Sequence, residues 1–162
     1  MKEFIDGKNR IWSISLTIAS AKRIRDLAEF NIADPENPNI LINLMSNPIL
    51  IADIGWAMIH PQALEKNIDA NDFGESLDGD RIECLCDIIL EEYVNFSGSR
   101  TRPATLKKIE TMRKMEKRTN ELMIGKMDNL KFEDIKPEVL RMMSSGAVAI
   151  ALQESLESNL AG

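Results

Sequence analysis

The sequence has one histidine, two cysteines and few aromatic residues, which make up 5% of its 162 positions. A single imidazole, that of His60, excludes a histidine-based metal cluster. Cys84 and Cys86 stand two positions apart in a segment with helical periodicity, so we expect small core residues rather than a disulfide. Without a disulfide framework, the chain fits a reducing compartment and must rely on a core of Ile, Leu, Met and Ala.

Catalytic signatures are also absent. The sequence contains no G-x-S-x-G, no P-loop, no G-x-G-x-x-G and no zinc-ligand spacing. The acidic stretch DANDFGESLDGD does not place its carboxylates at the offsets of a calcium-binding EF-hand loop. Helix caps and helix N-termini account for its aspartates more simply. We therefore expect a non-enzymatic protein with no cofactor and no metal.

Long apolar runs are missing as well. The longest, ILIADIGWAMI, is too short to cross a membrane and contains Asp53. Residues 1–9 lack the apolar region of a secretory signal. We expect a cytoplasmic protein with no membrane contact. The apolar fraction of 44% is enough for a real core, and a net charge of −6 argues against general nucleic-acid binding.

The residues that are present predict a mainly α fold with a short N-terminal β-hairpin and about five to six helices. In FIDGKNRIWSISL, strands at Lys2–Ile5 and Arg10–Leu16 flank Asp6-Gly7, residue types that tolerate the positive φ of tight hairpin turns. The second strand alternates apolar and polar residues, so its apolar face needs cover from the first helix and the central helix. The outer edges of the hairpin are candidate sites for strand addition.

Helix boundaries follow from caps and breakers. Four predicted helix starts carry a side-chain oxygen that can cap the helix: Thr17, Asn47, Asp69 and Asp78. Pro48 suits the first position of a central, buried helix, and Pro61 is predicted to end that helix at His60. Residues 1–100 are expected to hold the hairpin and the helical core. Residues 101–162 are expected to add a long basic helix, at about 103–127, and a C-terminal helical tail in the same domain.

Basic residues concentrate in the segment Arg100–Arg118. It holds eight Lys and Arg against two Glu, a balance of +6, whereas the remaining twelve basic and 24 acidic residues give −12. Three interpretations fit this charge run: contact with nucleic acid, docking on an acidic partner or subunit, and a solvated helix. The segment lacks aromatic residues for base stacking, which makes nucleic acid the least favoured of the three.

A narrow apolar seam runs along the same predicted helix. Met-rich seams adapt to varied partners, although they are more often ordinary core. On so charged a helix, the seam favours a contact with a partner or with a second copy of the chain. The residues predicted to make this contact are Leu106, Ile109, Met112, Arg113, Met115, Lys117, Leu122 and Met123.

Three segments covering about residues 3–108 carry a family resemblance. They are FIDGKNRIWSISLTIASAKRIRDL, NPILIADIGWAMIHPQA and DANDFGESLDGDRIECLCDIILEEYVNFSGSRTRPATLKK. They share turn, cap and core spacing with small bacterial and prophage proteins encoded among tail genes, and the chain resembles phage tail assembly chaperones. Residues after about 110 have no counterpart in this resemblance.

The resemblance implies a non-enzymatic role in tail assembly. Such chaperones bind the long tape measure protein, tail-tube subunits or both, in the cytoplasm of the host cell. Two alternatives stay open: a structural subunit of the virion or tail, and a nucleic-acid-associated protein that acts through Arg100–Arg118. A homo-oligomer is a further expected assembly.

Overall fold

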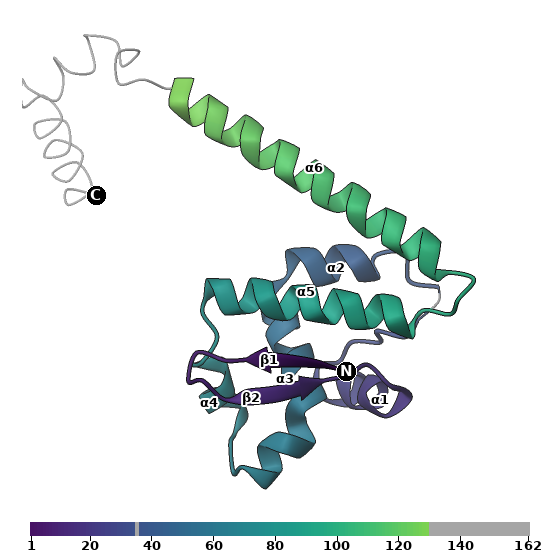
Figure 1. The fold of residues 1–162 in the computed structure, drawn as a ribbon, viewed down its shortest axis with the longest axis vertical. Helices are drawn as coiled ribbons and strands as arrows, with labels where there is room; N and C mark the ends of the chain where they lie inside the picture. The colour runs from purple at the N-terminus through teal and green to yellow at the C-terminus, as the bar shows by residue number, and fades with distance from the viewer. Residues whose placement is uncertain (35, 130–162) are drawn as a thin grey trace, which may run out of the picture. The chain divides into compact units, whose positions relative to one another are not determined.

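The computed structural model of the chain describes residues 1–34 and 36–129. Two strands and six helices make up this part: β1 (Lys2–Ile5), β2 (Ile11–Ile14), α1 (Ile18–Leu27), α2 (Ile40–Ser46), α3 (Pro48–Glu65), α4 (Ala70–Gly74), α5 (Gly79–Phe96) and α6 (Arg102–Asn129) (Figure 1). The predicted fold class, mainly α with a short N-terminal hairpin, is confirmed. The C-terminal helical tail predicted after about residue 130 lies outside the described residues.

The chain divides into two compact units within α6. The first unit is Met1–Thr111 and the second is Met112–Gly162. The first unit contains the hairpin, α1 to α5 and the first turns of α6. The second unit contains the rest of α6.

The hairpin is an antiparallel pair in which Phe4 lies opposite Trp12 and Lys2 opposite Ile14. Phe4, Trp12 and Ile14 are fully buried because the hairpin packs against α3 and α5. The buried carboxylate of Glu92 on α5 accepts a hydrogen bond from the Leu16 amide at 3.0 Å. The hairpin therefore covers the helical core, as the alternation in β2 predicts.

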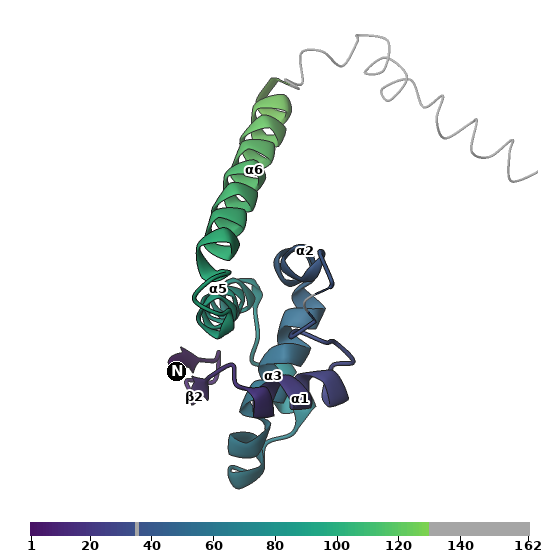
Figure 2. The ribbon, with the colours of Figure 1, turned by 90° about the vertical axis from the view of Figure 1, so that its right-hand side faces the viewer.

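Helix α1 packs mainly on α3 rather than on the hairpin, so the prediction that the first helix covers the hairpin is wrong (Figure 2). Its buried residues are Ser20, Ala21 and Ile24. The helix α5 takes the expected place of α1 against the strands. Which of the two amphipathic helices packs on the strands depends on the path of the chain. The periodicity of apolar residues does not specify that path.

Local capping sets the helix starts where the sequence predicts them. The Thr17 side chain accepts from the Ser20 amide and the Ser20 hydroxyl accepts from the Thr17 amide, which completes a capping box. Three further caps accept from the amide three positions on: Asn47 from Leu50, Asp69 from Asp72 and Asp78 from Arg81. These bonds satisfy helix N–H groups that otherwise lack partners.

The central helix α3 does not end at His60, because it continues through Pro61 to Glu65. Proline has no N–H, so the Ala57 carbonyl four residues earlier loses its helical donor. Arg23 of α1 supplies the missing donor, with its Nε 3.1 Å from the Ala57 oxygen. A side chain from another helix thus makes the internal proline tolerable.

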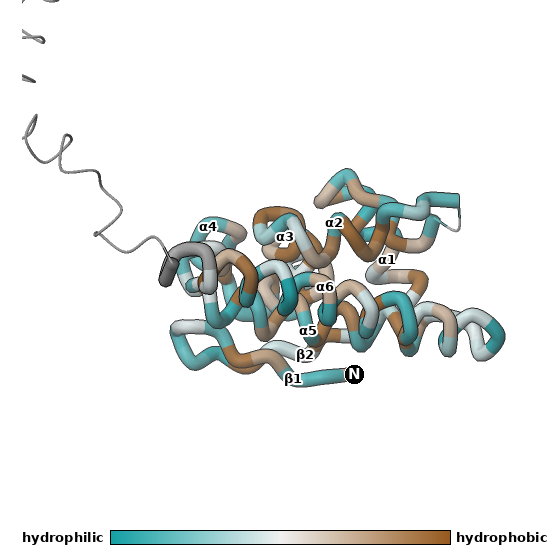
Figure 3. The backbone as a smooth tube through the Cα atoms, turned by 90° about the horizontal axis from the view of Figure 1, so that it is seen from above, coloured by the Kyte–Doolittle hydropathy of each residue, from teal (hydrophilic) through white to brown (hydrophobic). Residues whose placement is uncertain are grey.

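Apolar residues gather in α2 and α3, as the hydropathy colouring of Figure 3 shows.

Replacing Arg23 by alanine should lower the free energy of unfolding by about 1–3 kcal/mol, because the buried Ala57 carbonyl is left without a donor. Urea unfolding followed by circular dichroism measures this change. Arg25→Ala is the matched control, since Arg25 lies on the same helix and only pairs with Asp26 at the surface. Equal losses in the two variants would contradict the role assigned to Arg23.

The turn of the hairpin differs from the prediction in which of its residues has a positive φ. The residue with positive φ is Asn9, at 58°, and not Gly7. Gly7 is required for a different reason: its amide donates to the Ser76 carbonyl at 2.8 Å, and a Cβ there would lie 2.6 Å from that oxygen. The glycine therefore permits a close approach of the turn to the chain after α4.

A buried carboxylate organises the same turn. Asp6 is completely buried. Its Oδ1 accepts from the amides of Lys8 and Arg10, and its Oδ2 accepts from Trp12 Nε1 at 2.9 Å and Arg10 Nε at 2.6 Å. Arg10 also pairs with Asp72 of α4. Burial alone would raise the pKa of Asp6, but the bonds from Trp12 and Arg10 outweigh it and hold that pKa below its ordinary value.

Candidate partner-binding surface

An arginine side chain links the start of α6 to the end of α5. Arg102 donates to the carbonyls of Val94, Asn95 and Ser97 at 3.0–3.4 Å. These carbonyls lie at the C-terminal end of α5, where helical partners run out and positive charge is favourable. One of the eight basic residues of Arg100–Arg118 therefore caps a helix.

Two of the predicted partner-binding residues fall in the first unit, Met1–Thr111. Leu106 is 51% exposed, whereas Ile109 is only 8% exposed. Ile109 belongs to the buried residues of this unit, so a partner can reach Leu106 but not the Ile109 side chain. The sequence predicted both positions from spacing alone, which does not distinguish a buried residue from an exposed one.

The other predicted residues lie in the second unit. Met115, Leu122 and Met123 are 61–68% exposed, and Met112 is half-buried. At 3.6 residues per turn these four side chains fall within an arc about 100° wide, with Thr119 between them. We call Met112, Met115, Leu122 and Met123 the α6 stripe. Soluble proteins rarely leave a cluster of long apolar side chains uncovered unless it binds something.

Charged residues occupy the other side of this part of α6. Arg113 and Lys117 are exposed, and helical geometry directs Lys117 almost opposite the α6 stripe. These two predicted partner-binding residues therefore do not share a surface with the four apolar ones. Ile124, 59% exposed, was not predicted and also projects away from the stripe.

The outer edge of β2 is occupied by side chains from α3 and from Lys66, the residue that follows it. Gln62 accepts from the Ser13 amide at 2.9 Å and donates to the Ser13 carbonyl at 2.8 Å, as a neighbouring strand would. Lys66 donates to the Ile11 carbonyl at 2.9 Å. This edge is therefore closed to strand addition, which the sequence left open.

Metal-ligating side chains do not form a cluster in the described residues. No group of three or more His, Cys, Asp or Glu within residues 1–34 and 36–129 is placed to hold a metal ion. His60 lies edge-on to Trp56 with ring centroids 5.5 Å apart. Cys86 is half-buried and Cys84 is exposed, so the prediction that both belong to the core is wrong for Cys84.

No single helix among the described residues is long and apolar enough to cross a membrane. The pair α2 and α3 reaches the required length and composition only together, with a bend of 102° between them.

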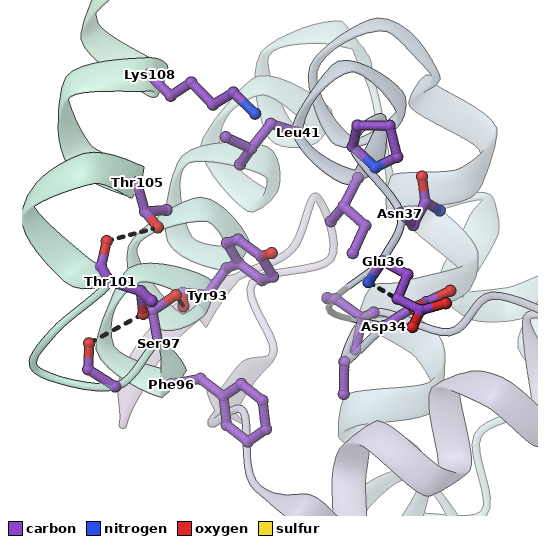
Figure 4. A pocket seen from close by; sticks show the side chains of 15 residues that line it. Asp34, Glu36, Asn37, Leu41, Tyr93, Phe96, Ser97, Thr101, Thr105 and Lys108 are labelled. Atoms are coloured by element: carbon purple, nitrogen blue, oxygen red, sulfur yellow. Dashed lines mark hydrogen bonds between the residues drawn. The ribbon is translucent and has the colours of Figure 1, made fainter.

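A cavity of about 590 Å³ lies entirely within the first unit and was not anticipated from the sequence. Its walls come from the loop before α2, the end of α5 and the first turns of α6 (Figure 4). The one available signal was the spacing of Ser97, Thr101 and Thr105, which repeats every four residues. That spacing alone indicates no cavity, because the opposite wall lies some 60 residues earlier in the chain.

Comparisons of this chain with protein-family models, with curated proteins and with solved structures found no match. The fold class and the surfaces described above are therefore the basis for a function.

Proposed function

We propose that this protein is a non-enzymatic chaperone of phage tail assembly, which binds the tape measure protein, tail-tube subunits or both through the α6 stripe. The observation that carries the proposal is the exposure of Met115, Leu122 and Met123 on one side of a charged helix. The resemblance of residues 3–108 to tail assembly chaperones supplies the biological setting.

The chemistry of the stripe suits this task. A tape measure protein is a long, partly apolar helical chain that aggregates when its apolar surface is left exposed. Methionine side chains are unbranched and polarizable, so they fit many apolar surfaces without one fixed geometry. The net charge of −6 keeps such a complex soluble. An amphipathic helix that offers an apolar stripe to another helix is a common mode of protein recognition.

Co-expression with the tape measure protein of the same genome tests the proposal. We expect the two chains to co-purify, and the soluble fraction of the tape measure protein to rise several-fold, because the stripe covers its apolar surface. A matched expression without this protein is the control. If the chains never co-purify and solubility is unchanged, the proposal fails. Recovery of the protein in mature tails would favour a structural subunit instead.

A further inference from the structure

The cavity of the first unit has walls of two kinds. Buried Ile32, Ile40 and Leu41 line it on the side of α2. The rings of Tyr93 and Phe96, both half-buried, project between the two walls in Figure 4. A volume of about 590 Å³ falls in the range of ordinary ligand sites. The walls suit a side chain or small ligand with an apolar stem.

The hydroxyl groups of the cavity offer acceptors rather than donors. Ser97 donates its proton to the Tyr93 carbonyl at 2.9 Å, Thr101 donates to Gly98 at 3.1 Å, and Thr105 donates to Thr101 at 3.2 Å. A hydroxyl has only one hydrogen to donate, so each of these oxygens presents lone pairs to a ligand. The group that binds here must therefore bring hydrogen-bond donors.

The charged residues that line the cavity also favour a positively charged ligand. Asp34 and Glu36 line the cavity from the loop before α2, and neither has an ion pair among the described residues. Within residues 1–34 and 36–129, the Asp34 carboxylate accepts one hydrogen bond, from the Glu36 amide to its Oδ1 at 3.0 Å. Lys108 lies on the other wall beside Leu41 (Figure 4). The lining thus carries a net charge of −1, which matches one monovalent cation.

We propose that this cavity binds a single arginine side chain of a partner protein. A guanidinium has five N–H donors and no acceptor, which complements a lining of hydroxyl lone pairs and carboxylates. Its flat face stacks on aromatic rings such as those of Tyr93 and Phe96, and its three methylene groups contact the aliphatic wall. The site is separate from the α6 stripe, so it stands whether or not a tape measure protein is the partner.

Tyr93 is the only tyrosine of the chain, so it reports on the cavity without any engineered probe. The full chain, labelled with ¹³C-tyrosine, gives one set of ring signals in an NMR spectrum. The ligand is an end-blocked Gly-Ala peptide with one central arginine. Its matched controls carry citrulline, which keeps the shape but not the charge, or lysine at the same place.

We expect the arginine peptide to shift the Tyr93 signals to saturation, with the citrulline peptide at least about tenfold weaker, since charge-assisted hydrogen bonds are lost. The paired change Asp34→Asn and Glu36→Gln should weaken arginine binding about tenfold. Lys108→Ala should strengthen it about threefold by removing a like charge. Asp53→Asn and Glu65→Gln, both exposed on α3, serve as charge-matched controls.

Four outcomes would overturn the proposal. The arginine peptide would leave Tyr93 unshifted, or the citrulline peptide would bind equally well. Spermidine would bind more tightly than the arginine peptide, which would assign the cavity to free polyamines. The Tyr93 signals would change with protein concentration together with the mass in solution, which would make a second copy of the chain the occupant. Circular dichroism of each variant confirms that it is folded.

Discussion

Replacing Asp6 by alanine is expected to lower the free energy of unfolding by about 3–5 kcal/mol. The carboxylate is fully buried and receives four hydrogen bonds, two from backbone amides and two from the side chains of Arg10 and Trp12. Without it, the Trp12 N–H and the two amides are left without an acceptor, and the Arg10 guanidinium loses its inner partner. Leaving a buried charge and buried donors unpaired is among the costliest of single changes.

Chemical unfolding in urea measures this loss directly. Asp53→Ala is the matched control, because Asp53 is exposed on α3 and a surface substitution of this kind stays within about 0.5 kcal/mol. In the Asp6→Ala variant, the hairpin and α4 should both become less protected from amide exchange, because Arg10 connects Asp6 to Asp72. Amide exchange at Phe4, Trp12 and Phe73 would report this loosening. A variant as stable as the control would show that the network does not contribute.

The acid dependence of stability gives a second readout of the same carboxylate. The folded-state pKa of Asp6 lies below its unfolded value of 3.8, and Lys8 and Arg10 likewise lower the pKa of Asp72. The folded protein therefore binds fewer protons than the unfolded chain in this range, so stability falls as the pH drops through the lowered pKa values. The contribution is fully present above the unfolded pKa. Asp6→Asn should reduce this acid-dependent loss of stability. Urea unfolding at a series of pH values from about 2 to about 6 measures the loss.

The second large effect is expected on partner binding. Met115→Glu combined with Leu122→Glu should weaken binding of a partner that docks on the α6 stripe by at least about 100-fold. Each exposed side chain that becomes buried in a complex contributes about 1.5–3 kcal/mol, and a charge in its place adds a desolvation cost. Both residues lie in the α6 stripe, two helical turns apart, and are more than 60% exposed. Co-purification and calorimetric titration with the partner measure the loss.

Asn120→Glu is the matched control for this variant. It adds the same negative charge to the same exposed helix, but helical geometry places Asn120 outside the arc of the α6 stripe. Neither variant should change the thermal unfolding of the first unit, because Met115, Leu122 and Asn120 all lie beyond Thr111. If Asn120→Glu reduced binding as much as the double variant, charge rather than the stripe would be responsible. Binding by charge alone would also vanish at high salt.

The arginine cavity and the α6 stripe would give the protein two chemically different contacts. One is adaptable and apolar, in the second unit, and the other is polar and charge-selective, in the first. Two contacts joined through one chain raise overall affinity by effective concentration. A protein that must later release its partner benefits when each contact is weak by itself.

The sequence by itself determined the elements whose causes are local. Helix starts at Thr17, Asn47, Asp69 and Asp78 follow from side chains that bond an amide three residues on. The hairpin follows from alternation in β2 and from a turn between two strands. These interactions join residues close in the chain, so the pattern of residues contains them. The fold class could be predicted for the same reason.

Only the tertiary structure decided the features that depend on residues distant in the chain. Pro61 continues inside α3 because Arg23, 38 positions earlier, donates to the carbonyl that proline leaves free. Gly7 is needed because the Ser76 backbone comes within hydrogen-bond distance of it. Ile109 is buried, although it follows the same helical spacing as the exposed apolar residues of α6. The cavity needs three separate segments to exist at all. Such contacts are set by the path of the chain, which neither periodicity nor local propensity specifies.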